Sequence, residues 1–313
     1  MSATFIAANA SQTMSCPVCD GSKFSKITDA GDYEYRLPGT FHISRCADCG
    51  LILQNPRPPF EDILRYYTEK YEPYHQVGSS AVQSIRHFFL VRPRATLYKK
   101  LIGERGKIVD VGCSVGGLLH ELSSQGQWEL LGVEPVVEIA SMGSAQGLHI
   151  IPKTLEEAGI PDASIDLAIM NHVLEHLPDP TNTVRYVSNM LKPGGYFVGE
   201  IPSPQCLERK IFGRYWGGYH LPRHLTFFSP NHIRKFLEKA GFEDVSVSYQ
   251  QQPSSSLLSY CNYLQHKNAS PRTLAFFSPH SLFWLILLTP ITTLLKLFGS
   301  APIIHFKARK PVR

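Results

Sequence analysis

The chain has 313 residues, of which 43% are hydrophobic and 18% charged, with 23 Gly and 23 Pro that follow no period. This composition excludes a small disulfide-stabilised protein, a disordered chain, a collagen-like chain and a coiled coil. Lys and Arg exceed Asp and Glu by 31 − 26 = 5, an excess too small to favour nucleic acid as a partner. The length predicts roughly two domains. Residues 1–15 lack the charged and apolar parts of a signal peptide, so we expect a cytoplasmic protein.

Four of the seven cysteines form two Cys-x-x-Cys pairs, Cys16 with Cys19 and Cys46 with Cys49. Each pair presents two sulfurs from one tight turn, and two such turns supply the four thiolates of a tetrahedral zinc ion. Disulfides are disfavoured in the cytosol. We therefore predict a small zinc-ribbon-like module with one structural zinc. The alternative is a set of four reduced, buried cysteines.

Residues 55–80 contain Asn-Pro-Arg-Pro-Pro and a Tyr-rich stretch, which indicate a linker with one short helix. A boundary near residue 80 follows, with the zinc-binding module and linker over 1–80 and a second domain over 81–313. The pattern of residues 81–105 fits a basic amphipathic helix that is interrupted near Pro93.

From Lys107 onward, short apolar runs alternate with helical stretches. The runs cover residues 108–111, 130–133, 149–151, 167–170, 196–201 and 245–249. This alternation is typical of βαβ units, so it predicts an α/β fold in which helices cover a parallel sheet.

The sharpest motif is Ile-Val-Asp-Val-Gly-Cys-Ser-Val-Gly-Gly-Leu-Leu at residues 108–119, a strand that enters a Gly-rich turn and opens a helix. Small residues in such a turn let a ligand approach the backbone. A nicotinamide-binding fingerprint would have glycine where Ser114 stands, and an acid, Asp110, ends the strand. The pattern resembles motif I of the class I S-adenosylmethionine-dependent methyltransferases. The resemblance implies that the turn holds the methionine part of the cofactor through Asp110, Gly112, Cys113, Ser114, Gly116 and Gly117.

Further blocks follow in the order of that family: Gly-Val-Glu-Pro at 132–135, a strand with Asn-His-Val-Leu-Glu-His-Leu-Pro-Asp-Pro at 171–180, and Leu-Lys-Pro-Gly-Gly at 191–195. The resemblance covers roughly residues 106–250 and implies a Rossmann-like seven-stranded sheet. It places Glu134, followed by Pro135, at the ribose hydroxyls, and Leu155 over the adenine. It also places Asn171 and His172 along the cofactor cleft and gives His176 a structural role. Base and glutamine amino-methyltransferases of this fold have Asn-Pro-Pro-Tyr where this chain has Asn-His-Val-Leu, so these classes are disfavoured.

The loop after the predicted fifth strand is rich in His, Tyr and Trp, and it leads into a helix capped by Ser229 with Pro230 at its first position. His224 and His220 are the leading candidates for a general base, with Tyr219 beside them. The alternative is that they only hydrogen-bond the loop. The loop also resembles that of deoxysugar C-methyltransferases with a four-cysteine zinc module. Arg223 replaces their glutamate, however, and 313 residues leave no room for their further C-terminal domain.

We therefore expect a hydroxyl acceptor, with Arg223, Arg214 or Arg209 available to pair with an acidic group of the substrate. We predict an S-adenosylmethionine-dependent O-methyltransferase with a histidine base, acting on a small-molecule, sugar or glycan, or lipid-like acceptor. The alternatives are C-methylation of a nucleotide sugar, a nicotinamide-dependent oxidoreductase and a non-catalytic cofactor-binding protein.

Residues 273–295 contain no Asp, Glu, Lys or Arg, and this uncharged stretch is long enough for a membrane span. Pro290 is expected to break this stretch, and residues 302–310 resemble the last strand of the family, which must return to the sheet. We therefore predict an apolar helical insertion over about 254–300, formed as a hairpin. Three alternatives stay open: peripheral contact through 273–300 with the inner face of the membrane, a lid over a greasy acceptor, and a buried core or dimer surface.

Overall fold

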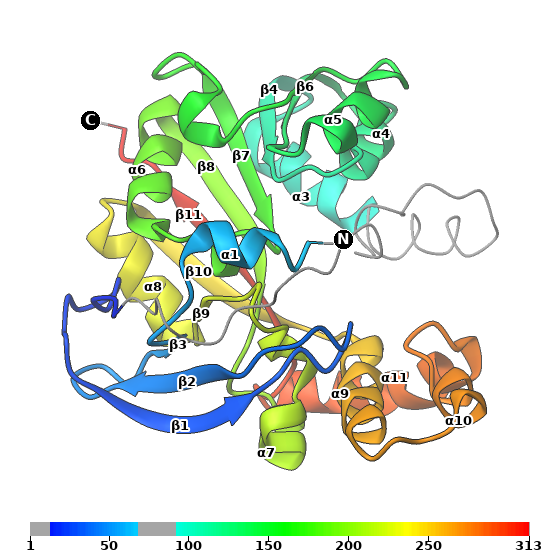
Figure 1. Ribbon diagram of the computed structural model, residues 1–313. Helices are drawn as coiled ribbons and strands as arrows, with labels where there is room; N and C mark the ends of the chain where they lie inside the picture. Colours follow the sequence, from blue (N-terminus) through cyan, green and yellow to red (C-terminus); the bar gives the residue numbers. More distant parts are fainter. Residues whose placement is uncertain (1–12, 68–91, 313) are drawn as a thin grey trace.

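The computed structural model describes residues 13–67 and 92–312, which form two sheets and the helices around them (Figure 1). The larger sheet has the strand order β10-β11-β8-β7-β4-β5-β6. Its strands are β4 (Arg105–Val111), β5 (Gln127–Val133), β6 (Ile150–Ile151), β7 (Ile165–Asn171), β8 (Leu191–Pro202), β10 (Glu243–Gln250) and β11 (Ile303–Arg309). Strand β11 runs antiparallel between β8 and β10, and the pairs from β8 to β6 are parallel. The predicted Rossmann-like seven-stranded fold is therefore confirmed.

Alternate residues of the central strands enter opposite sides of this sheet, because side chains of a strand alternate with period two. Ile108 of β4 and Leu167 of β7 pack on one side with Tyr98 of α3 (Arg92–Ile102). Val109 and Ala168 pack on the other side, beneath α6 (Pro180–Met190) and α8 (Pro230–Lys239). The remaining helices of this region are α4 (Gly117–Leu122), α5 (Val137–Ser144) and α7 (Leu207–Phe212).

Helix α8 begins as the sequence predicts. The hydroxyl of Ser229 accepts a hydrogen bond from the backbone N–H of His232, and Pro230 occupies the first helical position, where its missing N–H is not needed.

The N-terminal module contains a second, antiparallel sheet of β1 (Phe24–Ala30), β2 (Phe41–Cys46) and β3 (Ile52–Gln54). Its fourth strand, β9 (Thr226–Phe227), comes from the loop region that follows β8 and pairs with β3. The predicted linker helix is present as α1 (Phe60–Leu64). The expected boundary near residue 80, and the part of the predicted basic helix before residue 92, lie outside the described residues.

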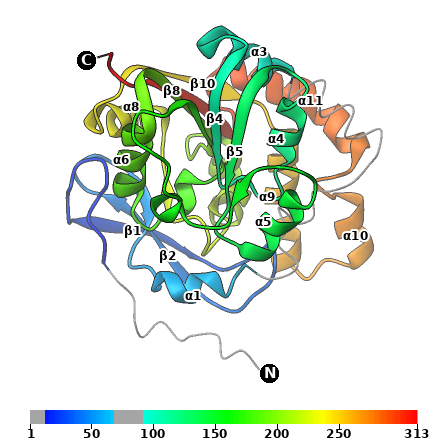
Figure 2. The same cartoon turned by 90° about the horizontal axis from the view of Figure 1, so that it is seen from above.

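The apolar insertion is helical, as predicted, and forms α9 (Pro253–His266), α10 (Pro271–Phe276) and α11 (Leu282–Leu297) on one side of the molecule (Figures 1 and 2). The expectation that Pro290 ends its helix is wrong, since α11 continues through this residue. The hydroxyls of Thr289, Thr292 and Thr293 each donate to a carbonyl four residues back, so these polar groups are satisfied within the apolar helix. No described helix has both the length and the hydropathy needed to cross a membrane.

Candidate active site

A left-handed turn joins β4 to α4. Gly112, Ser114 and Gly116 have φ values of +69°, +50° and +77°, a region that favours glycine. The backbone N–H of Gly112 donates to the carbonyl of Val133 over 2.7 Å, so the turn is held against the end of the neighbouring strand β5. Gly117 begins α4, and the thiol of Cys113 is buried beneath the turn.

The carboxylate of Glu134, directly after β5, reaches back to this turn. Its Oε2 accepts from the N–H of Ser114 and its Oε1 accepts from the N–H of Val136, both over 3.0 Å. Burial raises the pKa of Glu134, although these two N–H groups oppose the shift.

A second buried carboxylate, Asp110, lies at the end of β4. Burial raises the pKa of Asp110 to about 7; the charge of Arg94 opposes this shift, and nearby Glu134 contributes to it. Arg94 itself is bound to Glu200 of β8, with nitrogen–oxygen distances of 2.6 and 3.2 Å. Two carboxylates with raised pKa values beside an open backbone turn suit a ligand that brings an ammonium group and hydroxyl donors. S-adenosylmethionine has both groups.

The other predicted cofactor residues lie along the same edge of the sheet. Asn171 ends β7 and His172 follows it, with φ +55°. Leu155 is buried in a short 3-10 helix, and Pro135 is exposed beside Glu134. Parallel strands β5, β4 and β7 are neighbours, so the ends of all three meet at this edge. Their roles in cofactor binding stay predictions.

Four histidines gather next to this edge. His172 Nδ1 lies 3.4 Å from Oε1 of Glu175, and His224 Nε2 lies 3.9 Å from the same oxygen. The ring of His224 is 4.4 Å from that of His176 and 4.9 Å from that of His220, centroid to centroid. The cluster therefore connects the end of β7 with the loop after β8.

The two candidate bases differ in their surroundings. His224 is buried and its Nδ1 lies 2.8 Å from the carbonyl oxygen of Gly218. Burial and the neighbouring imidazoles of His176 and His220 hold the pKa of His224 well below its ordinary value. His220 is half-buried, and its Nδ1 lies 2.7 Å from Oε2 of Glu34, a residue of the N-terminal module. Burial alone would raise the pKa of Glu34, but adjacent His220 and Arg223 bring it below the ordinary value.

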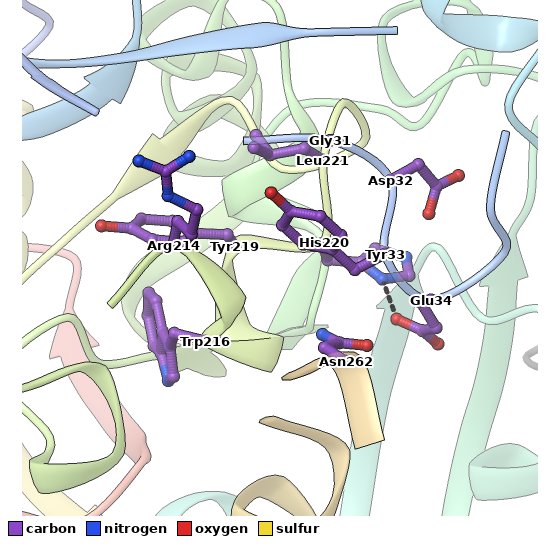
Figure 3. Close-up of a pocket in the computed structure, with 10 residues that line it drawn as sticks. All are labelled: Gly31, Asp32, Tyr33, Glu34, Arg214, Trp216, Tyr219, His220, Leu221 and Asn262. Carbon is purple, nitrogen blue, oxygen red and sulfur yellow. Dashed lines mark hydrogen bonds and ion pairs between the residues drawn. The ribbon is translucent and has the colours of Figure 1, made fainter. Parts of the chain in front are cut away.

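His220 and Glu34 line a small hollow between the module and the loop after β8, partly open to solvent, with an enclosed volume of about 10 Å³, enough for one water molecule (Figure 3). Tyr219 also lines it, and its ring is buried between Trp216 and Phe227. The hydroxyl of Tyr219 accepts a weak hydrogen bond from Arg209 over 3.4 Å. Arg214 is exposed at the same hollow.

The expectation that Arg223 pairs with a substrate is wrong. Its side chain is fully buried, with Nη2 2.9 Å from Oδ2 of Asp32, and Nε donates to the carbonyl of Tyr66. An unpaired guanidinium at this depth would be costly, so Asp32 is its structural partner. Arg209 is also engaged, because its Nε donates to the carbonyl of Pro204. Of the three arginines, Arg214 is the one exposed in the hollow.

The sequence did not point to Asp32, Glu34 or Glu175. Asp32 is 191 positions from its partner Arg223, and Glu34 is 186 positions from His220. No local spacing predicts such pairings. Glu175 belongs to the stretch 171–180 that resembles the family, directly before His176. Its burial between histidines from two loops becomes visible only in the fold.

The four cysteines of the two pairs come together, as predicted. The Sγ atoms of Cys16 and Cys49 are 3.5 Å apart, as are those of Cys19 and Cys46. Both turns have the same backbone bonds, from Cys16 N–H to Gly21 and from Cys46 N–H to Leu51. Four sulfurs within 4.8 Å of one another fit the tetrahedral arrangement of a zinc ion. Burial raises the pKa of Cys49 to about 11, so that a cation would be needed to hold it as thiolate at neutral pH.

Comparisons with known proteins agree with this geometry. The sequence model of a family described as a methyltransferase domain matches residues 82–247. A tRNA U34 carboxymethyltransferase of Desulfotalea psychrophila is 26% identical over 204 residues, which are 60% of this chain and 64% of that protein. This chain therefore matches slightly less than two thirds of that relative. A ubiquinone biosynthesis O-methyltransferase of Cereibacter sphaeroides is 24% identical, with 56% of this chain and 76% of that protein covered.

Solved structures show the same fold at low identity. A methyltransferase of Thermotoga maritima, described as a possible histamine N-methyltransferase, aligns with a TM-score of 0.52 and 18% identity over 80% of this chain and all of that one. Phosphoethanolamine N-methyltransferase 2 of Haemonchus contortus, in complex with S-adenosylmethionine, aligns with a TM-score of 0.52 and 17% identity over 83% of this chain and 63% of that one.

The turn after β4 yields a stability prediction. A Cβ at Gly112 would overlap with Val173, whereas at Gly103, with φ +77°, a Cβ meets nothing within 4 Å. Gly103→Ala should cost about 1 kcal/mol, for the backbone conformation alone. Gly112→Ala should cost a further 1–3 kcal/mol or so, because Val173 must move. Urea unfolding of both variants measures the difference; equal losses would contradict the close packing of the turn.

Proposed function

The chain belongs to the methyltransferase-domain family, and from this premise we propose that it transfers the methyl group of S-adenosylmethionine to a hydroxyl oxygen of a small sugar-like or lipid-like acceptor. The observation that supports oxygen as the methylated atom is the His220–Glu34 pair, which lies at the hollow beside the cofactor edge. The name of a similar protein, a ubiquinone biosynthesis O-methyltransferase, supports the same choice.

The residues at the edge of the sheet would hold the cofactor. Asp110 would accept from its ammonium group, Glu134 would bind its ribose hydroxyls, and the turn from Gly112 to Gly116 would face its methionine part. When bound, S-adenosylmethionine supplies an electrophilic methyl carbon on a sulfonium, so that the reaction is an in-line displacement. The protein must then orient the acceptor and take its proton.

His220 is the better of the two predicted bases. Its Nδ1 is held by the carboxylate of Glu34, which fixes the ring and would stabilise the imidazolium formed when Nε2 takes the acceptor proton. His224 has its Nδ1 committed to a backbone carbonyl and lies deeper in the protein. Tyr219 and Arg214 would line the acceptor, and Arg214 would pair with an acidic group on it.

We also propose that the four cysteines hold one structural zinc. This zinc would fix the module from which Glu34 and Asp32 approach the loop after β8. The module would therefore be part of the acceptor site rather than an appendage.

The insertion would lie in the interface of an anionic membrane. Large apolar side chains of α11 are exposed by half or more at Leu282, Phe283, Ile286, Leu287, Ile291, Leu294 and Leu297. Their spacing places them on one side of the helix. No Asp or Glu occurs in residues 245–313, whereas Lys267, Arg272 and Lys296 lie in or beside the insertion. Apolar faces with basic neighbours favour anionic lipid over a second copy of the same positively charged surface.

The base hypothesis predicts a selective loss of turnover. His220→Gln should lower kcat by about 10²- to 10⁴-fold, and Glu34→Gln by a smaller factor, with cofactor affinity unchanged. The measurement is transfer of radiolabelled methyl from S-adenosylmethionine to a panel of lipid extracts, phenols and sugars. His149→Gln, at an exposed histidine of the same domain, is the matched control. Full activity of His220→Gln would contradict its role.

Cofactor affinity should depend on pH through Asp110. Burial raises the pKa of Asp110 to about 7, so the carboxylate ionises as the pH rises past neutrality. The association constant for S-adenosylhomocysteine, measured calorimetrically, should therefore increase up to tenfold per pH unit between pH 5.5 and 7. Above pH 7 it should level off. Asp110→Asn should bind more weakly and with a flat profile. A flat profile in the unaltered protein would contradict the role of Asp110.

The membrane proposal predicts sedimentation with vesicles that contain phosphatidylglycerol. Ile286→Ser combined with Ile291→Ser should weaken binding at least tenfold, because both side chains leave the apolar face. Ile211→Ser, at an equally exposed isoleucine of α7, is the control and should bind as the unaltered protein does. Dimerisation in solution without vesicle binding would show that a second copy covers the face instead.

A further inference from the structure

Glu175 is a buried carboxylate whose oxygens, in the described part of the chain, have only long contacts with imidazole nitrogens. Its side chain is 1% exposed, and neither of its oxygens has a hydrogen-bond partner among the described residues. The nearest imidazole nitrogens are those of His172 and His224, at 3.4 and 3.9 Å from Oε1. A carboxylate at this depth that has only such long imidazole contacts is costly, so groups of this kind usually serve a purpose beyond stability.

Two imidazoles face this carboxylate from different segments. His176 is the next residue along the chain, in the short 3-10 helix Leu174–His176, and His224 belongs to the loop after β8. Ligand atoms of Glu175, His176 and His224 all lie within 4.8 Å of one another. Bonds of about 2.1 Å to one ion would bring such atoms to roughly 3.4 Å from one another, so the side chains would have to approach by up to about 1.4 Å.

The imidazole of His224 is oriented as a metal ligand requires, whereas that of His176 would have to exchange one of its present hydrogen bonds for the metal. His224 donates from Nδ1–H to the carbonyl of Gly218, which leaves the lone pair on Nε2, the nitrogen that faces Glu175. His176 has its Nδ1 2.9 Å from the hydroxyl of Tyr67. Metal-bound histidines are commonly held in this manner by a carbonyl or another polar group at the second nitrogen. Ligation by His176 would replace its hydrogen bond with the backbone of Arg223.

We propose that Glu175, His176 and His224 bind a divalent transition-metal ion, separate from the four-cysteine cluster. Two neutral imidazoles and one carboxylate suit Zn²⁺, Co²⁺, Ni²⁺ or Fe²⁺ and leave coordination positions open. The ion would lie between the end of β7 and the hollow that His220 lines, since His224 and His220 are 4.9 Å apart, ring to ring.

An open position of the ion would take an oxygen of the acceptor. This part of the inference rests on the proposed function. A bound cation lowers the pKa of a hydroxyl that coordinates it, so the acceptor oxygen would lose its proton to His220 more readily and would be held in line with the methyl carbon. The acceptor would then be one whose hydroxyl stands next to a second oxygen donor, able to chelate the ion.

The test measures metal binding without any acceptor. Protein with one equivalent of zinc, which the cysteines retain, is titrated calorimetrically with Co²⁺, and the absorption spectrum is recorded. We expect one further binding site whose spectrum lacks the strong charge-transfer bands of cobalt thiolates. Glu175→Gln and His224→Ala should each weaken this site at least tenfold, whereas His149→Ala, which removes an exposed histidine, should not change it.

Two results would overturn the proposal: no cobalt binding beyond the cysteine site, or equal affinity in Glu175→Gln, His224→Ala and the unaltered protein. Glu175→Gln keeps the size of the side chain, and its fold is checked by thermal melting and by binding of S-adenosylhomocysteine. Failure of the unaltered protein to bind S-adenosylhomocysteine would count against the proposed function, and it would leave the cobalt result to decide the metal site.

Discussion

The site depends on one constraint of the fold: three adjacent parallel strands end at the same edge of the sheet. Strand β4 delivers Asp110, β5 delivers Glu134, and β7 delivers Asn171 and His172 to this edge. The left-handed turn from Gly112 lets the backbone fold back so that Ser114 can donate to Glu134. Two buried carboxylates at one edge are costly on their own, and a ligand with matching donors would offset that cost.

The N-terminal module would complete the other half of the proposed site. Strand β9 adds to the module sheet beside β3, and the buried Arg223–Asp32 pair fastens the same loop to the module. These contacts bring Glu34 to His220, so the proposed base and the carboxylate that would orient it come from the N-terminal module and the loop after β8. A structural zinc in the cysteine cluster would thereby influence an acceptor site that it does not touch.

The sequence predicted what local pattern and spacing determine. Alternating apolar runs located the strands, the glycine turn and its acid indicated the cofactor edge, and the cysteine pairs predicted the cluster. The contacts of Asp32 with Arg223 and of Glu34 with His220 were not predicted, because no local sequence pattern marks residues that pair across so many positions. Pro290 was taken to end a helix, but α11 continues through it to Leu297. Arg223 was taken for a substrate contact because sequence does not reveal that it is buried.

The central claim is that the edge formed by β4, β5 and β7 binds S-adenosylmethionine and not a nicotinamide cofactor. Calorimetric titration of the purified protein with S-adenosylhomocysteine and, separately, with NADH tests it most directly. We predict binding of S-adenosylhomocysteine in the micromolar range, weakened by Glu134→Ala, and no binding of NADH. Binding of NADH alone, or of neither compound, would contradict the account.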